Sequence, residues 1–78
     1  MEMSRAFAAV LKARRRAEGL SQEMLAEKAD IHPTHVGLIE RSLRNPSLNV
    51  AKALADALGV SLADMIAQAE RTCRRRRQ

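Results

Sequence analysis

Hydrophobic residues recur at helical spacing along most of the chain. Phe7, Val10 and Leu11 stand at positions i, i+3 and i+4, which predicts a first helix over residues 4–18. Gly19 follows, and glycine is typical of the position just past a helix end.

The next two helices are predicted to be short and close together. Ser21 is a favourable N-cap for a helix over residues 22–29. His32 would cap another helix, which continues to residue 40 or 41. Pro33 falls at the first position of that helix, where a missing N–H costs nothing.

Two further helices follow a loop. Ser47 is expected to cap a helix whose apolar stripe ends at Leu58, and Gly59 closes it. Ser61 opens a fifth helix, with Asp64 placed for a near capping box. Only 1% of the residues are aromatic, which disfavours strands. We therefore expect an all-α fold, a compact five-helix bundle.

The net charge of +5 is concentrated at one end of the chain. Up to Glu70 the chain carries nine Lys or Arg and nine Asp or Glu, so this part is formally neutral. The excess comes from residues 71–78, which hold five arginines and no acid. We expect one domain over residues 1–70 and a disordered basic tail over 71–78. The tail could add nonspecific DNA affinity, act as a solubilising end, or be an added remnant.

Several classes of protein are disfavoured by the residues present. The lone Cys73 cannot form an intrachain disulfide, and no apolar run is long enough for a membrane span, so we expect a cytoplasmic protein. His32 and His35 are three residues apart, but no acidic or cysteine ligands complete a metal set. No nucleophile–base pair or phosphate loop is present, so we expect no enzyme and no cofactor.

Residues 22–41, QEMLAEKADIHPTHVGLIER, have the pattern of a helix-turn-helix. Ala26 is a small residue where two helices would cross closely, and a shifted register would bury Glu27 or Lys28. The positions expected to face inward are Leu25, Ala29, Ile31, Val36 and Ile39. The second helix of such a unit is shaped to enter the DNA major groove.

The expected outer face of that helix has groups suited to DNA. Thr34 can bond a base edge or touch a thymine methyl, and His35 can donate to a phosphate or to guanine. Leu38 offers only apolar contact. Arg41 and Arg44 place positive charge beside this helix, where it can neutralise phosphates.

The chain resembles the helix-turn-helix proteins of the phage lambda repressor type, also called the XRE family, over residues 5–68. The resemblance is carried by GLSQEMLAEKADI and by HPTHVGLIERSLRNPSLNVAKALADALGVSL. The segment IERSLRNPSL and the small size are most similar to controller proteins of restriction–modification systems. The resemblance implies a lambda repressor-like DNA-binding domain that works as a homodimer on a symmetric double-stranded operator, with one or two dimers on adjacent sites and no small-molecule ligand. A controller would activate or repress a restriction–modification operon.

The resemblance also implies roles for particular residues. It places base reading on Pro33, Thr34, His35 and Leu38. It places backbone or flanking contacts on Gln22, Arg44 and Asn45, and the positions of His32 and Arg41 beside the same helix make these two residues further flanking candidates. It further implies a structural ion pair between Arg15 and Glu40.

The chain departs from the family pattern at several positions. Asp30 stands where a glycine is common in the turn, and aspartate tolerates the left-handed conformation better than most residues. Ser42 also replaces a common glycine. Pro33 and Leu38 replace polar contact residues, so base recognition is expected to be sparse and to depend partly on DNA shape.

Some interpretations remain open from the sequence. Residues 14–16, three arginines, are either a phosphate patch or a solvated helix end with Arg15 paired. The apolar side of the fifth helix is a candidate dimer contact through Leu62, Met65 and Ile66. A phage-type repressor or an antitoxin autoregulator is an alternative to a controller. A helix-turn-helix that binds protein and not DNA is an alternative of another class.

Overall fold

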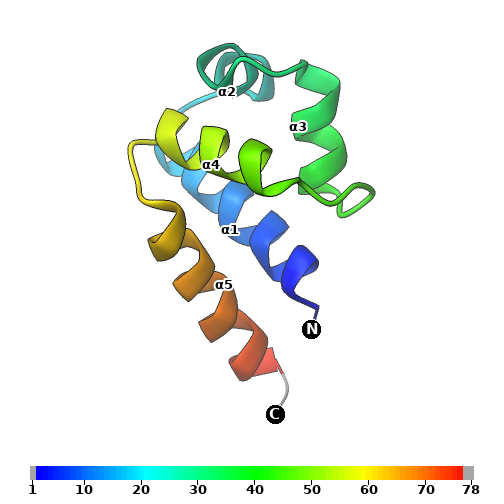
Figure 1. Ribbon diagram of the computed structural model, residues 1–78, viewed down its shortest axis with the longest axis vertical. Coiled ribbons are helices and arrows are strands. Elements are labelled where there is room, and N and C mark those ends of the chain that lie inside the picture. Colours follow the sequence, from blue (N-terminus) through cyan, green and yellow to red (C-terminus); the bar gives the residue numbers. More distant parts are fainter. Residues whose placement is uncertain (1, 77–78) are drawn as a thin grey trace.

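The computed structural model describes residues 2–76 of the 78-residue chain, and this part forms five α-helices (Figure 1). They are α1 (Met3–Ala17), α2 (Gln22–Ala29), α3 (Pro33–Glu40), α4 (Leu48–Ala57) and α5 (Leu62–Arg76). The predicted all-α five-helix fold is confirmed, and most helix ends fall within a residue or two of their expected positions.

The N-cap residues expected from the sequence are found at the starts of α2, α3, α4 and α5. The hydroxyls of Ser21, Ser47 and Ser61 each accept a hydrogen bond from a backbone N–H three residues on, at 3.0, 3.1 and 3.0 Å. Each bond satisfies a donor that the helix itself leaves unpaired. At α3 the cap is His32, whose Nδ1 accepts from the N–H of Thr34 at 3.1 Å.

The helices form two groups that share one core. α1 and α5 lie side by side and run in opposite directions, while α2, α3 and α4 gather at the other end of the molecule (Figure 1). The start of α1 therefore meets the end of α5, where the Sγ of Cys73 lies 3.7 Å from the Sδ of Met3. The largest fully buried side chains come from all five helices: Leu11, Leu25, Val36, Ile39, Leu54 and Met65.

The expected disordered tail is wrong for most of its length, because α5 continues to Arg76. Arginine is a good helix former, and α1 packs beside α5. Within this part of α5 the hydroxyl of Thr72 donates to the carbonyl of Gln68 at 3.0 Å. Residues 77–78, the end of the predicted tail, lie outside the described residues. None of the helices within residues 2–76 has the length and apolar character needed to cross a membrane.

Candidate nucleic-acid interface

The turn between α2 and α3 sets the angle at which α3 is presented. Asp30 adopts the left-handed conformation, with φ 57° and ψ 47°, and the N–H of Ile31 reaches back to the carbonyl of Ala26 at 3.0 Å. This arrangement ends α2 and satisfies its last carbonyls. Ala26 is fully buried, as expected for the point where the two helices cross. The turn predicted from aspartate's tolerance is confirmed.

Gly37 is a feature of this crossing that the sequence reasoning missed. It is buried on the inner side of α3, and a Cβ built there would lie 3.4 Å from Oε1 of Gln22. The first residue of α2 therefore lies directly against the middle of α3. A glycine inside a short helix was the available signal, since such a residue often marks a close approach.

Three of the expected base-reading residues lie on the accessible side of α3. Pro33 and Thr34 are exposed at its first turn, and Leu38 is partly exposed one turn later. The hydroxyl of Thr34 is thus accessible at the start of α3, and the opposite side of this helix packs on the core. A side chain placed in this way can reach a base edge only if α3 enters a groove.

His35 differs from its neighbours on α3. Its ring is half-buried, and its Nε2 is covered and has no hydrogen-bond partner among the described residues. In this rotamer Nε2 cannot touch DNA. A role for His35 in base reading therefore requires the ring to turn outward, whereas Thr34 needs no rearrangement.

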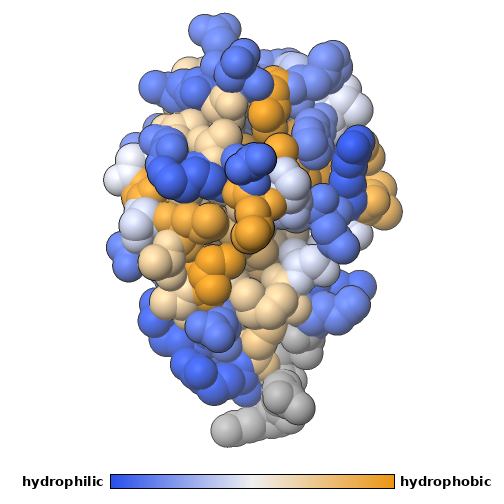
Figure 2. All heavy atoms as spheres, in the orientation of Figure 1, coloured by the Kyte–Doolittle hydropathy of each residue, from blue (hydrophilic) through white to orange (hydrophobic). Residues whose placement is uncertain are grey.

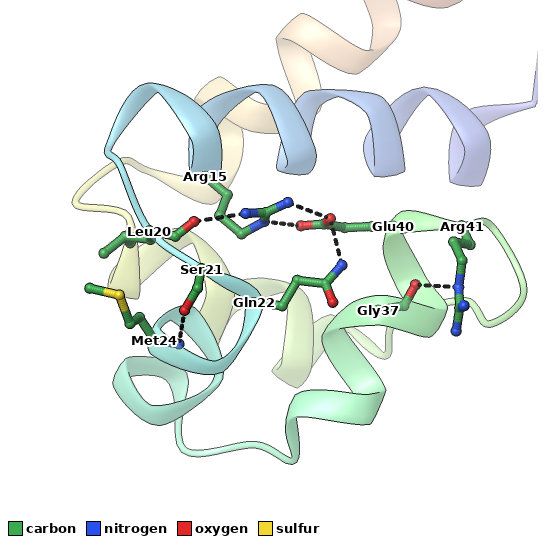
Figure 3. Close-up of polar contacts among 8 residues, drawn as sticks. All are labelled: Arg15, Leu20, Ser21, Gln22, Met24, Gly37, Glu40 and Arg41. Carbon is green, nitrogen blue, oxygen red and sulfur yellow. Dashed lines mark hydrogen bonds and ion pairs between the residues drawn. The ribbon is translucent and has the colours of Figure 1, made fainter.

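A buried polar network joins α1, α2 and α3 behind the exposed side of α3 (Figure 3). Arg15 donates through Nε to Oε2 of Glu40 at 2.6 Å, and through a terminal nitrogen to Oε1 at 3.1 Å. The same guanidinium donates to the carbonyl of Leu20 at 2.7 Å. Gln22 donates through Nε2 to Oε1 of Glu40, also at 3.1 Å. The implied Arg15–Glu40 pair is present, and it also orients Gln22.

This network is shielded from water. The side chains of Arg15 and Glu40 are 10% and 2% exposed. The hydrogen bond to Glu40, followed by the attraction of its charge, raises the pKa of Arg15 above the ordinary value, although burial opposes the shift. Because its pKa is raised, the guanidinium of Arg15 keeps its charge until strong alkali, so this half of the pair does not change with pH under ordinary conditions.

The residues expected to flank the DNA contact lie around the end of α3. Arg41 is exposed, and its Nε donates to the carbonyl of Gly37 at 3.2 Å, which caps the helix (Figure 3). Ser42 adopts a positive φ of 60°, and the loop that follows exposes Arg44 and Asn45. This loop is on the same side of the molecule as the end of α3 (Figure 1). Two exposed guanidinium groups thus accompany α3.

The expected dimer contact needs a correction. Met65 has no exposed surface and belongs to the core, so it cannot meet a partner without unfolding. Leu62 and Ile66 are partly exposed and pack on the edge of the core. Apolar side chains gather over the face formed by α4 and the first half of α5 (Figure 2). Met65 was a wrong candidate because i, i+3, i+4 periodicity identifies only the apolar side of a helix. It does not show which residues of that side face the core and which lie at its outer edge.

The three arginines at residues 14–16 have different environments. Arg15 is buried in the network, Arg14 is partly buried with Nε donating to Oε1 of Gln68 at 2.8 Å, and Arg16 is exposed. The interpretation as a solvated helix end with Arg15 paired describes this turn better than a uniform phosphate patch. Across the described residues, no three His, Cys, Asp or Glu side chains come together as a metal site requires.

A comparison with known protein families identifies the family to which the chain belongs. A family model described as HTH_3, helix-turn-helix, matches residues 11–65, which include all of α2, α3 and α4. The chain belongs to this helix-turn-helix family. Proteins similar to this chain include one named as an HTH-type transcriptional regulator and one named as a clp gene regulator.

Two relatives and one solved structure illustrate the similarity. The control protein C.SmaI of Serratia marcescens is 35% identical over 66 residues, which cover 85% of this chain and 79% of that protein. The immunity repressor of Bacillus phage phi105 is 38% identical over 58 residues, but the match spans only 40% of that repressor. The restriction-modification controller protein C.AhdI from Aeromonas hydrophila superposes with a TM-score of 0.77 at 37% identity, over 80% of this chain and 94% of that one.

Proposed function

We propose that this HTH_3 protein is a sequence-specific transcriptional regulator that binds a symmetric DNA operator as a homodimer. Within that class, we propose that it is a controller of a restriction–modification operon acting in the cytoplasm. α3 would lie in the major groove, and two copies would read half-sites about one helical turn apart.

One observation carries the proposal: the start of α3 exposes Thr34 while a buried network fixes the helix from behind. Base discrimination needs a reading group held in a defined place, and the contacts of Arg15 and Gln22 with Glu40 provide that support. Gln22 uses one N–H of its amide for Glu40, which leaves a second N–H for a backbone phosphate. The similarity to C.SmaI and C.AhdI supports the controller assignment.

Selection of binding sites from random duplex DNA by the purified protein tests the proposal. We expect enrichment of a two-fold symmetric consensus. Failure to enrich any sequence at moderate salt would contradict it and favour a helix-turn-helix that binds protein.

A pair of variants then separates the roles of individual residues. Thr34→Ala should relax the preference at one or two base positions and leave the fold intact, because the side chain is exposed. Arg44→Gln should instead weaken binding to all sequences and reduce the salt slope by about 1. Lys52→Gln on α4, which also removes one exposed charge, serves as the control. The roles are wrongly assigned if Arg44→Gln changes only the preferred bases.

A phage-type repressor is the second candidate, supported by the similarity to the phi105 immunity repressor. The two candidates differ in the genes that they control more than in their chemistry. Mapping the selected consensus onto the genome of the source distinguishes them: a site upstream of a restriction–modification operon supports a controller, and sites within a prophage support a repressor.

A further inference from the structure

We propose that the end of α5, together with the facing side of α1, is a second DNA-binding surface that contacts the phosphate backbone without reading sequence. We call it the α1–α5 basic surface, and among described side chains it comprises Arg14, Arg71 and Arg74. It is distinct from the surface formed by α3 and the loop after it.

The first observation is the location of the charge. The part of the chain up to Glu70 is formally neutral, so the net attraction of this protein for DNA at long range comes from residues 71–78. These residues are not a separate tail, because the helix carries them to Arg76. The charges of Arg71 and Arg74 are therefore carried by a helix that packs beside α1.

The second observation is an open groove between α1 and α5. Its volume is about 570 Å³, and it has Arg14 and Arg71 among its lining residues, with Ala9, Ala13 and Ala17 contributing small side chains from α1. Small side chains allow a bulky strand of sugar and phosphate to approach between two guanidinium groups. Guanidinium groups offer forked donors that match phosphate oxygens.

The third observation is that these arginines are not neutralised. Among the described side chains of residues 2–74, ion pairs join Arg15 to Glu40 and Lys52 to Asp56, and none involves an arginine of the α1–α5 basic surface. The hydrogen bond of Arg14 to Gln68 uses only its Nε–H. Arg71 and Arg74 are exposed and three residues apart, so they project from one side of α5. Glu70 is the one acidic residue in the second half of this helix as far as residue 76.

The part of this surface on α5, with Arg71 and Arg74, lies away from the start of α3 (Figure 1). The end of α5 lies at one tip of the molecule with the start of α1, whereas α2 and the start of α3 lie toward the opposite tip (Figure 1). On the face that Figure 2 shows, hydrophilic side chains gather at the lower left, below the apolar face of α4 and α5. Phosphates bound at Arg71 and Arg74 would therefore lie outside the base pairs that the start of α3 reads.

The test compares two double variants that each remove two exposed positive charges. Arg71→Gln with Arg74→Gln changes the proposed surface, and Lys12→Gln with Lys52→Gln is the matched control elsewhere. Binding of each variant to a short random-sequence duplex is followed by fluorescence anisotropy over a range of salt concentrations. Far-ultraviolet circular dichroism verifies that both variants remain helical.

We expect the arginine variant to flatten the salt slope by roughly 1.8, because each phosphate that an arginine neutralises contributes about 0.9 to the slope. The same change should weaken binding by roughly ten- to sixtyfold at about 0.1 M salt. The control should change affinity by less than about twofold. Arg71→Lys with Arg74→Lys should restore the slope, because it restores the charge.

Equal effects of the arginine variant and the control would overturn the proposal. Competition by polyglutamate as effective as by duplex DNA at equal charge would also overturn it, since the surface would then recognise acidic protein. Thr34→Ala should leave the salt slope unchanged. The proposal of operator recognition and the proposal of this second surface can therefore be refuted independently of each other.

Discussion

Replacing Glu40 by alanine tests whether the buried network holds the α3 surface in place. The variant leaves the guanidinium of Arg15 with the carbonyl of Leu20 as its remaining acceptor, and it removes the acceptor of Gln22. Because the side chains of Arg15 and Glu40 are 10% and 2% exposed, water cannot readily replace the missing carboxylate. Glu40→Ala should therefore be far more damaging than removal of a surface ion pair.

The expected cost follows from this burial. Removing one partner of a buried ion pair typically costs about 3–5 kcal/mol. For a domain of this size, each kcal/mol lowers the melting temperature by about 4–8 °C, so the expected decrease is roughly 12–40 °C. Such a destabilisation approaches the whole stability of a typical small domain, which is about 5–15 kcal/mol. Glu40→Gln keeps an oxygen acceptor and should cost less, about 1.5–3 kcal/mol.

Urea denaturation followed by circular dichroism provides the free energies of unfolding. The matched control is Asp56→Ala, which removes the partner of Lys52 in an ion pair whose side chains are 61% and 59% exposed. This control should cost no more than about 0.5 kcal/mol, since exposed pairs at i, i+4 contribute little. If Glu40→Ala costs as little as Asp56→Ala, the reasoning from burial is refuted.

Three further variants test other features of the structure. Ser42→Gly should raise the unfolding free energy by about 1 kcal/mol in the same urea assay. Ser42 has a φ of 60°, a conformation that costs a non-glycine residue about 1–2 kcal/mol. An unchanged or lower unfolding free energy would contradict this prediction. His35→Leu should leave stability unchanged or raise it by about 1 kcal/mol, since it removes a covered nitrogen without a partner, and a decrease above that size would show that the imidazole makes a needed contact. Ile66→Glu should yield a folded monomer by light scattering, whereas Met65→Glu should unfold the chain, and a dimeric Ile66→Glu protein would place the interface elsewhere.

The helices and their order were predictable from local chemistry. Ser21, Ser47 and Ser61 cap helices because a hydroxyl at that position satisfies a free backbone N–H, whatever the rest of the fold does. Asp30 turns the chain because its own side chain tolerates the left-handed conformation. Properties of this kind depend on a few neighbouring residues, so the sequence alone determined five helices and a helix-turn-helix.

The tertiary structure decided which side of each helix is free and what lies across from it. It buried Met65 and left Ile66 at the edge, although both belong to the same apolar side of α5. It covered Nε2 of His35 while exposing Thr34, and it placed Gln22 against both Gly37 and Glu40. It also kept residues 71–76 helical beside α1. These outcomes depend on contacts between residues far apart in the chain, which periodicity within one helix does not record.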